Sequence, residues 1–169
     1  MKTIILNGSG TAGKGQFYSY CFDWITKNIG NGKCYKTSII DPIKEFAATI
    51  GWKGGKSDGD RKFLADLKDL IEIYNNLPRN FIKTEIEAAQ QNNCSYIFID
   101  MREPNDIDWV KENFDNVITV LIDREETHRT YGNSADDGVK NYSYDYIIDN
   151  NGSLKELEDA VITFMEDIL

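Results

Sequence analysis

The stretch Thr3-Ile4-Ile5-Leu6-Asn7-Gly8-Ser9-Gly10-Thr11-Ala12-Gly13-Lys14 decides the fold of this chain. Its first five residues form a short run rich in β-branched side chains, which is typical of a strand buried on both faces inside a parallel sheet. Glycine-rich residues follow, and then Phe17, Cys21, Trp24 and Ile25 repeat at helical spacing. The sequence therefore predicts a strand, a tight turn and a helix over residues 16–29 in direct succession.

The turn has the spacing G-x-x-x-x-G-K, in the strand-to-helix context that a phosphate-binding loop requires. Glycines let successive backbone N–H groups point into one concavity, and the helix adds the positive end of its dipole. We expect the loop to bind the phosphates of ATP, with the ammonium of Lys14 beside the β- and γ-phosphates. The predicted phosphate-binding residues are Gly8, Ser9, Gly10, Thr11, Ala12, Gly13, Lys14, Gly15 and Gln16.

The rest of the chain alternates apolar runs with helical periodicity. Further strands are predicted at residues 36–40, 96–100, 117–122 and 146–148. Helices are predicted at 43–50, 63–74 and 81–91, in a short segment from Asn105 or Asp106, and from Leu154 after a Ser153–Glu156 capping box. Asp41 is expected to cap a helix and Pro78 to close one. This alternation predicts a three-layer α/β/α fold with a parallel five-stranded sheet, in a single domain over residues 1–169.

Composition narrows the classes of function. The formal net charge of −9 argues against general binding to nucleic acid or to an anionic membrane, because both need a basic surface. No apolar run reaches the roughly 18 residues of a membrane span, and we expect a cytoplasmic protein. Cys21, Cys34 and Cys94 are predicted to be small buried hydrophobic residues, and a single histidine excludes a histidine-rich metal site.

Gly13-Lys14-Gly15 resembles the P-loop nucleoside and deoxynucleoside monophosphate kinases, adenylate kinase among them, which commonly have G-K-G-T at this point. Gln16 stands where that family places a threonine that contacts magnesium. Met101-Arg102-Glu103-Pro104 after a strand resembles a feature of deoxynucleotide-kinase-like proteins. The resemblance implies a P-loop kinase fold, with an acceptor-binding insertion at about residues 42–92 and a short lid at about residues 124–144.

The resemblance also implies roles for particular residues. Asp100, at the end of a strand, would organise Mg²⁺, although an aspartate is also common where a strand meets a turn. Arg102 would clamp a phosphate, unless it forms a surface salt bridge with Glu103. The implied catalytic residues are Lys14, Arg102, Arg124 and Arg129; the acceptor would contact Asp41, Trp52, Lys56, Arg61 and Arg102, and the donor base would lie against Asn150, Asn151 and Gly152.

The resulting hypothesis is phosphoryl transfer from ATP, with magnesium, to a nucleoside or deoxynucleoside monophosphate. Two alternatives stay open at this point. The first is a P-loop kinase for another small acceptor, because the donor half of the site would be the same. The second is a nucleotide-binding protein without turnover, which Gln16 in place of a hydroxyl residue favours. The partners expected are small-molecule nucleotides, and the sequence leaves the oligomeric state open.

Overall fold

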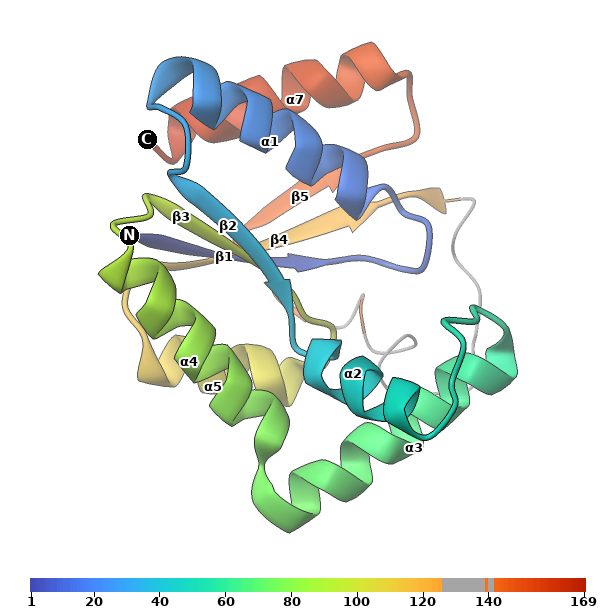
Figure 1. The fold of residues 1–169 in the computed structure, drawn as a ribbon. Helices are drawn as coiled ribbons and strands as arrows, with labels where there is room; N and C mark the ends of the chain where they lie inside the picture. The colour runs from blue at the N-terminus through green and yellow to red at the C-terminus, as the bar shows by residue number, and fades with distance from the viewer. Residues whose placement is uncertain (126–138, 140–141) are drawn as a thin grey trace.

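A computed structural model describes residues 1–125, 139 and 142–169 of the chain. Figure 1 shows helices packed on the two faces of a central sheet. The described helices and strands, in chain order, are β1 (Lys2–Asn7), α1 (Lys14–Asn28), β2 (Cys34–Ser38), α2 (Asp41–Thr49), α3 (Asp58–Asn75), α4 (Leu77–Gln91), β3 (Tyr96–Asp100), α5 (Pro104–Asn113), β4 (Val117–Asp123), β5 (Tyr146–Asp149) and α7 (Leu154–Asp167).

The described strands form a five-stranded sheet in the order β2-β3-β1-β4-β5, and every neighbouring pair is parallel. β1 is central, between β3 and β4. After β1 the chain first forms the edge strand β2, returns to β3 beside β1, and then forms β4 and β5 on the other side. In parallel sheets a ligand binds outside the carboxyl ends of the strands where the strand order reverses. The turn that follows Asn7 lies at this position.

Two apolar cores cover the two faces of the sheet. Ile4 and Leu6 of β1 point into a core with α1 and α7, whereas Ile5 points into a core with α4 and α5. This alternation follows from the two-residue period of a strand, which sends successive side chains to opposite faces. The predicted three-layer α/β/α fold with a parallel sheet is confirmed.

Several predicted boundaries are wrong for identifiable reasons. β2 covers Cys34–Ser38 rather than residues 36–40, because it pairs in register with β3 and ends opposite Asp100. Asp41 does not cap α2; it is the first helical residue and follows the N-cap Ile40. Pro78 does not close a helix but lies in the first turn of α4, where its missing N–H costs no helical hydrogen bond.

The third helix differs most from its prediction. A capping box between Ser57 and Asp60 starts α3 at Asp58, before the first apolar residue of the periodic stripe. Near the end of α3 two residues of the predicted apolar period are exposed, Leu70 at 66% and Tyr74 at 87%, and Lys68 is the buried residue of the helix. The predicted boundaries of β3 and the Ser153–Glu156 capping box of α7 are confirmed.

Candidate active site

The loop after β1 is a tight turn in which two glycines are required. A Cβ atom on Gly8 would lie 2.6 Å from the carbonyl oxygen of Ile122, and one on Gly13 would lie 2.2 Å from the side-chain nitrogen of Asn150. Both glycines have positive φ angles, 146° and 104°, which side chains rarely adopt. Gly13 is the N-cap of α1, so the N–H groups of the first turn of α1 follow the loop directly.

The ammonium of Lys14 lies against its own loop. Nζ donates hydrogen bonds to the carbonyl oxygens of Gly8, at 2.5 Å, and Ser9, at 3.1 Å. Lys14 is half-buried, whereas Gly15 and Gln16 are exposed on the first turn of α1. The structure therefore brings the predicted lysine to the loop, where it supplies a positive charge at the first turn of the helix.

Asn7 holds the base of the loop and was not predicted as a site residue. It is fully buried, and its Oδ1 accepts a hydrogen bond of 2.7 Å from the backbone N–H of Gly8. Its Nδ2 donates to the carbonyl oxygen of Arg102, at 3.0 Å, and to the hydroxyl of Tyr144, at 2.7 Å. Tyr144 in turn donates to the carbonyl oxygen of Val139. One amide thus joins the phosphate loop to the turn after β3 and to the segment before β5.

The segment after β5, expected to lie against the donor base, touches the phosphate loop. Asn150 donates from Nδ2 to the carbonyl oxygen of Ala12 at 2.7 Å. Asn151 donates from Nδ2 to Asp149 within its own turn, and its Oδ1 accepts from the backbone N–H of Glu125, after β4. At Gly152, a Cβ atom would lie 2.4 Å from the carboxylate of Glu156 in the capping box. These contacts place the segment beside the loop, and the base contact stays a prediction.

Arg61 extends from the first turns of α3 to the phosphate loop. A Cβ atom on Gly10 would lie 2.8 Å and 2.9 Å from the two terminal nitrogens of the Arg61 guanidinium. The Ser57–Asp60 capping box fixes this end of α3, and Asp60 also accepts a 2.9 Å hydrogen bond from the indole N–H of Trp52. The predicted acceptor residue Arg61 is therefore placed over the donor loop by the helix that carries it.

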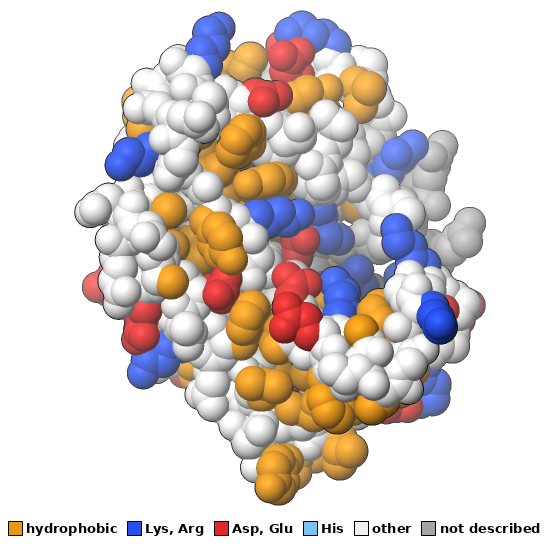
Figure 2. Space-filling model, in the orientation of Figure 1, with side chains coloured by type: hydrophobic (Ala, Val, Ile, Leu, Met, Phe, Trp, Pro, Cys, Tyr) orange, Lys and Arg blue, Asp and Glu red, His pale blue; other side chains and the backbone are white. Residues whose placement is uncertain are grey.

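A cavity of about 410 Å³ opens from the phosphate loop. Three of the predicted phosphate-binding residues line it, and so do four of the five predicted acceptor residues: Gly10, Thr11 and Lys14 from the loop, and Trp52, Lys56, Arg61 and Arg102 from the acceptor side. Asp41 is not among the lining residues; its carboxylate pairs with Lys44 at 3.2 Å, and Lys44 lines the cavity instead. Figure 2 shows basic and acidic side chains gathered in a hollow near the centre of this face.

Asp100 lies at the end of β3 and lines the same cavity. Lys36 of β2 forms a salt bridge of 3.0 Å with its Oδ2 atom. Its Oδ1 atom is buried and receives no hydrogen bond from the residues that the structure describes. A buried carboxylate oxygen without a partner is unusual, and carboxylates are the ligands that Mg²⁺ prefers. The Oδ1 atom of Asp100 therefore fits the predicted contact with a magnesium ion or its bound water.

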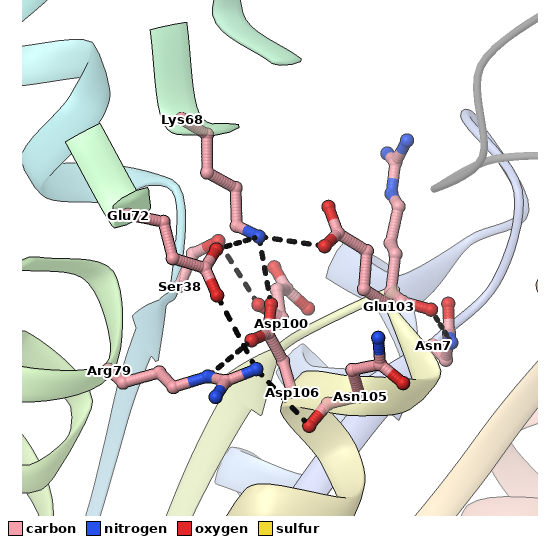
Figure 3. A network of polar contacts seen from close by, with 10 residues as sticks. Asn7, Ser38, Lys68, Glu72, Arg79, Asp100, Glu103, Asn105 and Asp106 are labelled. Carbon is pink, nitrogen blue, oxygen red and sulfur yellow. Dashed lines mark hydrogen bonds and ion pairs between the residues drawn. The ribbon is translucent and has the colours of Figure 1, made fainter. Parts of the chain in front are cut away.

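A second charged cluster, which the sequence did not reveal, surrounds Lys68 on the wall of the cavity (Figure 3). The Lys68 ammonium donates to Glu72 at 3.1 Å, to Glu103 at 2.8 Å and to Asp106 at 2.9 Å. Arg79 binds the other oxygen of Asp106 at 2.9 Å. We call these five residues the Lys68 cluster. The signal that could have found it is the polar Lys68 within the apolar period of α3.

The Lys68 cluster keeps its charges by mutual compensation. Burial alone would lower the pKa of Lys68, but the carboxylates of Asp106 and Glu103 outweigh it, so the pKa lies above its usual value. Burial raises the pKa of Glu103, although the nearby Lys68 ammonium opposes this rise. The salt bridge between Arg102 and Glu103 that the sequence left open is replaced by the pair between Lys68 and Glu103.

The remaining predicted arginines are only partly described. Arg102 lies in the turn after β3 and lines the cavity. Arg124 follows β4 and is half-buried. Arg129, His128 and most of the segment expected to form a lid at residues 124–144 lie outside the described residues.

Among the helices that the structure describes, none combines the length and the apolar composition that a membrane span requires.

Comparison with solved structures shows which fold this arrangement shares. A sugar kinase from a Janibacter species and thymidylate kinase from Ehrlichia chaffeensis each superpose with a TM-score of 0.57 at 14% identity, covering 98% of this chain and 95% and 98% of theirs. APS kinase from Mycobacterium tuberculosis, in complex with AMPPNP and APS, superposes with a TM-score of 0.51 at 12% identity, covering 98% of this chain and 97% of its own. The chain has the α/β fold of these P-loop kinases.

By sequence, no family model matches the chain, and no curated protein matches it either.

Proposed function

We propose that the protein transfers the γ-phosphoryl group of ATP to the phosphate of a nucleoside or deoxynucleoside monophosphate. The observation that carries the proposal is the position of Arg61, whose guanidinium covers Gly10 of the phosphate loop at the mouth of the cavity. Phosphoryl transfer needs two substrates held in line with positive charge around the moving group. A guanidinium between a phosphate loop and an acceptor cavity supplies that charge where the two phosphates would meet.

In this proposal the backbone N–H groups of the loop and Lys14 bind the donor phosphates. Arg102 lines the same cavity from the turn after β3 and would bind the acceptor phosphate together with Arg61, while Trp52 and Lys56 complete the acceptor side. Arg124, and Arg129 beyond the described residues, would approach the transferring group. Magnesium bound near Asp100 would neutralise charge on the donor phosphates. The residues that would bind the donor and those that would bind the acceptor belong to different elements of the fold, which suits a reaction between two substrates.

Two further candidates have support in particular observations. Solved structures of similar fold include a sugar kinase and APS kinase, so a small acceptor other than a nucleoside monophosphate is consistent with the fold. Gln16 is exposed on the first turn of α1 and offers an amide where related proteins offer a hydroxyl, which favours nucleotide binding without turnover. The cavity beside the loop supports an acceptor, and hence the proposal, over the second candidate.

The test is release of ADP by the purified full chain with ATP and Mg²⁺ across a panel of acceptors. The panel contains the nucleoside and deoxynucleoside monophosphates, sugars, and adenosine phosphosulfate. Turnover that depends on a monophosphate is the expected result. If only a sugar or adenosine phosphosulfate supports turnover, the protein is a kinase for that acceptor instead. If ATP binds tightly but no acceptor leads to release of ADP, the protein binds nucleotide without turnover.

A further inference from the structure

The cavity has two chemically different ends, separated by the length of two helical turns. Arg61 contacts the phosphate loop at one end, and Lys68 lies seven residues later on α3, about 10 Å along the helix axis at 1.5 Å per residue. Leu64 and Ala65 line the cavity between them, and Met101 faces it from the turn after β3. A phosphate held at Arg61 would thus place the other end of a nucleotide, across an apolar stretch, at the Lys68 cluster.

The hydrogen-bonding capacity of the Lys68 cluster is almost fully used. Lys68 spends its three N–H groups on Glu72, Glu103 and Asp106, so it has none left for a ligand. Both carboxylate oxygens of Asp106 are also engaged, one by Lys68 and one by Arg79. The cluster therefore offers no donor to the cavity from the Lys68 ammonium.

Glu103 is the member of the cluster that remains open to a ligand. Its Oε2 atom binds Lys68, whereas no described residue donates a hydrogen bond to Oε1. Its side chain is 29% exposed, against 1% for Asp106, and it lines the cavity, which Glu72 does not. The wall at this end consequently presents an acceptor oxygen and requires a donor from whatever binds there.

We infer that Glu103 selects acceptors whose nucleobase carries an exocyclic amino group. This inference rests on the proposed function and adds the class of base. Guanine, cytosine and adenine present amino N–H groups to a carboxylate, whereas the carbonyl oxygen that replaces the amino group in uracil would face Glu103 as a second acceptor. Hydrogen bonds to a charged group are among the stronger ones, and an unpaired buried acceptor is costly.

Matched pairs of acceptors test the inference. dGMP and dIMP differ only by the 2-amino group, which makes them the stricter pair; dCMP and dUMP differ at the 4-amino group, which becomes a carbonyl, and at N3, which gains a proton in uracil. With wild-type protein, ATP and Mg²⁺, we expect kcat/KM to be about 10- to 100-fold higher for the amino-bearing member of each pair, the range of a hydrogen bond to a charged group. The KM for ATP should be the same within each pair.

Glu103→Gln makes the test specific to this side chain. The amide oxygen can keep the bond to Lys68 and turn its NH₂ toward the cavity, which changes the open group from acceptor to donor. The preference should then reverse toward dUMP, whose carbonyl oxygen O4 accepts from the new amide, and it should fall for the dGMP and dIMP pair, because dIMP offers no acceptor in place of the amino group. Glu72→Gln is the matched control, because it alters the same cluster without facing the cavity, and it should keep the wild-type ratio.

Three results would overturn the inference. Equal kcat/KM within both pairs, an unchanged ratio in Glu103→Gln, or the same change in Glu72→Gln each contradicts selection by Glu103 while leaving the kinase proposal intact. If no nucleoside monophosphate is phosphorylated at all, the proposed function fails and this inference fails with it. Thermal unfolding of each variant shows that the comparison is made on folded protein.

Discussion

The side-chain amide of Asn7 donates a 3.0 Å hydrogen bond to the carbonyl oxygen of Arg102, which ties the end of β1 to the turn after β3. The same residue accepts from Gly8 at the start of the phosphate loop. The donor loop and a proposed acceptor arginine are thus positioned by one buried side chain. The geometry between the two substrate sites depends on a residue that would touch neither substrate.

Asn7→Ala should lower both stability and turnover. The buried N–H of Gly8 and two part-buried oxygens, of Arg102 and Tyr144, lose a partner, and a buried group left unsatisfied typically costs about 1–3 kcal/mol. Chemical denaturation should show the loss of stability, and kcat should fall more than the KM for ATP changes, because the loop keeps its backbone donors. Asn28→Ala is the control, since that exposed amide also donates to a backbone carbonyl, at 2.8 Å. Equal effects of the two substitutions would contradict a positioning role.

Lys14→Ala should reduce turnover strongly while leaving stability nearly unchanged. The ammonium donates to two carbonyl oxygens of its own loop, and the loop shape depends on the glycines. Removing one preorganised charge-stabilising donor typically costs about 10²–10³-fold in kcat. Steady-state kinetics and thermal unfolding measure the two effects. Lys27→Ala, in the last turn of α1, should change neither, and wild-type turnover in Lys14→Ala would remove the donor assignment.

Arg61→Ala should raise the KM for the acceptor more than the KM for ATP. The guanidinium lies at the junction of loop and cavity, so kcat should fall as well. Initial rates at varied concentrations of each substrate separate the effects. Lys62→Ala is the neighbouring control, because its ammonium pairs with Asp66 on the exposed side of α3. Equal increases in both KM values would show that Arg61 is structural.

Lys68→Met should destabilise the fold. Three carboxylates lose their shared cation, and breaking a buried ion pair by removing one partner costs about 3–5 kcal/mol. The free energy of unfolding in urea measures this loss. Lys83→Met, which breaks an exposed pair with Glu87, should cost far less. A loss no larger than that of the control would mean that Arg79 alone compensates the cluster.

Much of the fold could be predicted from local patterns. The apolar runs of β1, β3 and β4 are buried on both faces, so their composition alone marks them as central strands. β2 lies at the edge of the sheet, where pairing with β3 rather than apolar content sets its ends. The apolar period of α3 was a poor guide to the limits of this helix and to its buried side, because the face that lines the cavity carries Arg61 and Lys68.

The site could be predicted only where chemistry is concentrated in one segment. The phosphate loop combines spacing, context and a lysine within a few residues, and its predicted turn is confirmed. The Lys68 cluster draws its members from α3, α4 and the start of α5, so the local pattern of α3 can single out Lys68 but not its partners. The role of Asn7 could not be predicted for the same reason, since two of its hydrogen-bond partners are 95 and 137 residues away in the chain.

The resting position of Lys14 has a consequence for nucleotide exchange. The Lys14 ammonium donates hydrogen bonds to two peptide oxygens of the loop, so a phosphate that binds it must replace these oxygens as its partners. The free energy that Lys14 contributes to binding is the difference between its bonds to phosphate oxygens and its bonds to peptide oxygens, and this lowers the affinity for the triphosphate. On departure of the product, the same oxygens receive the lysine again, and the empty loop is left without an unpaired cation.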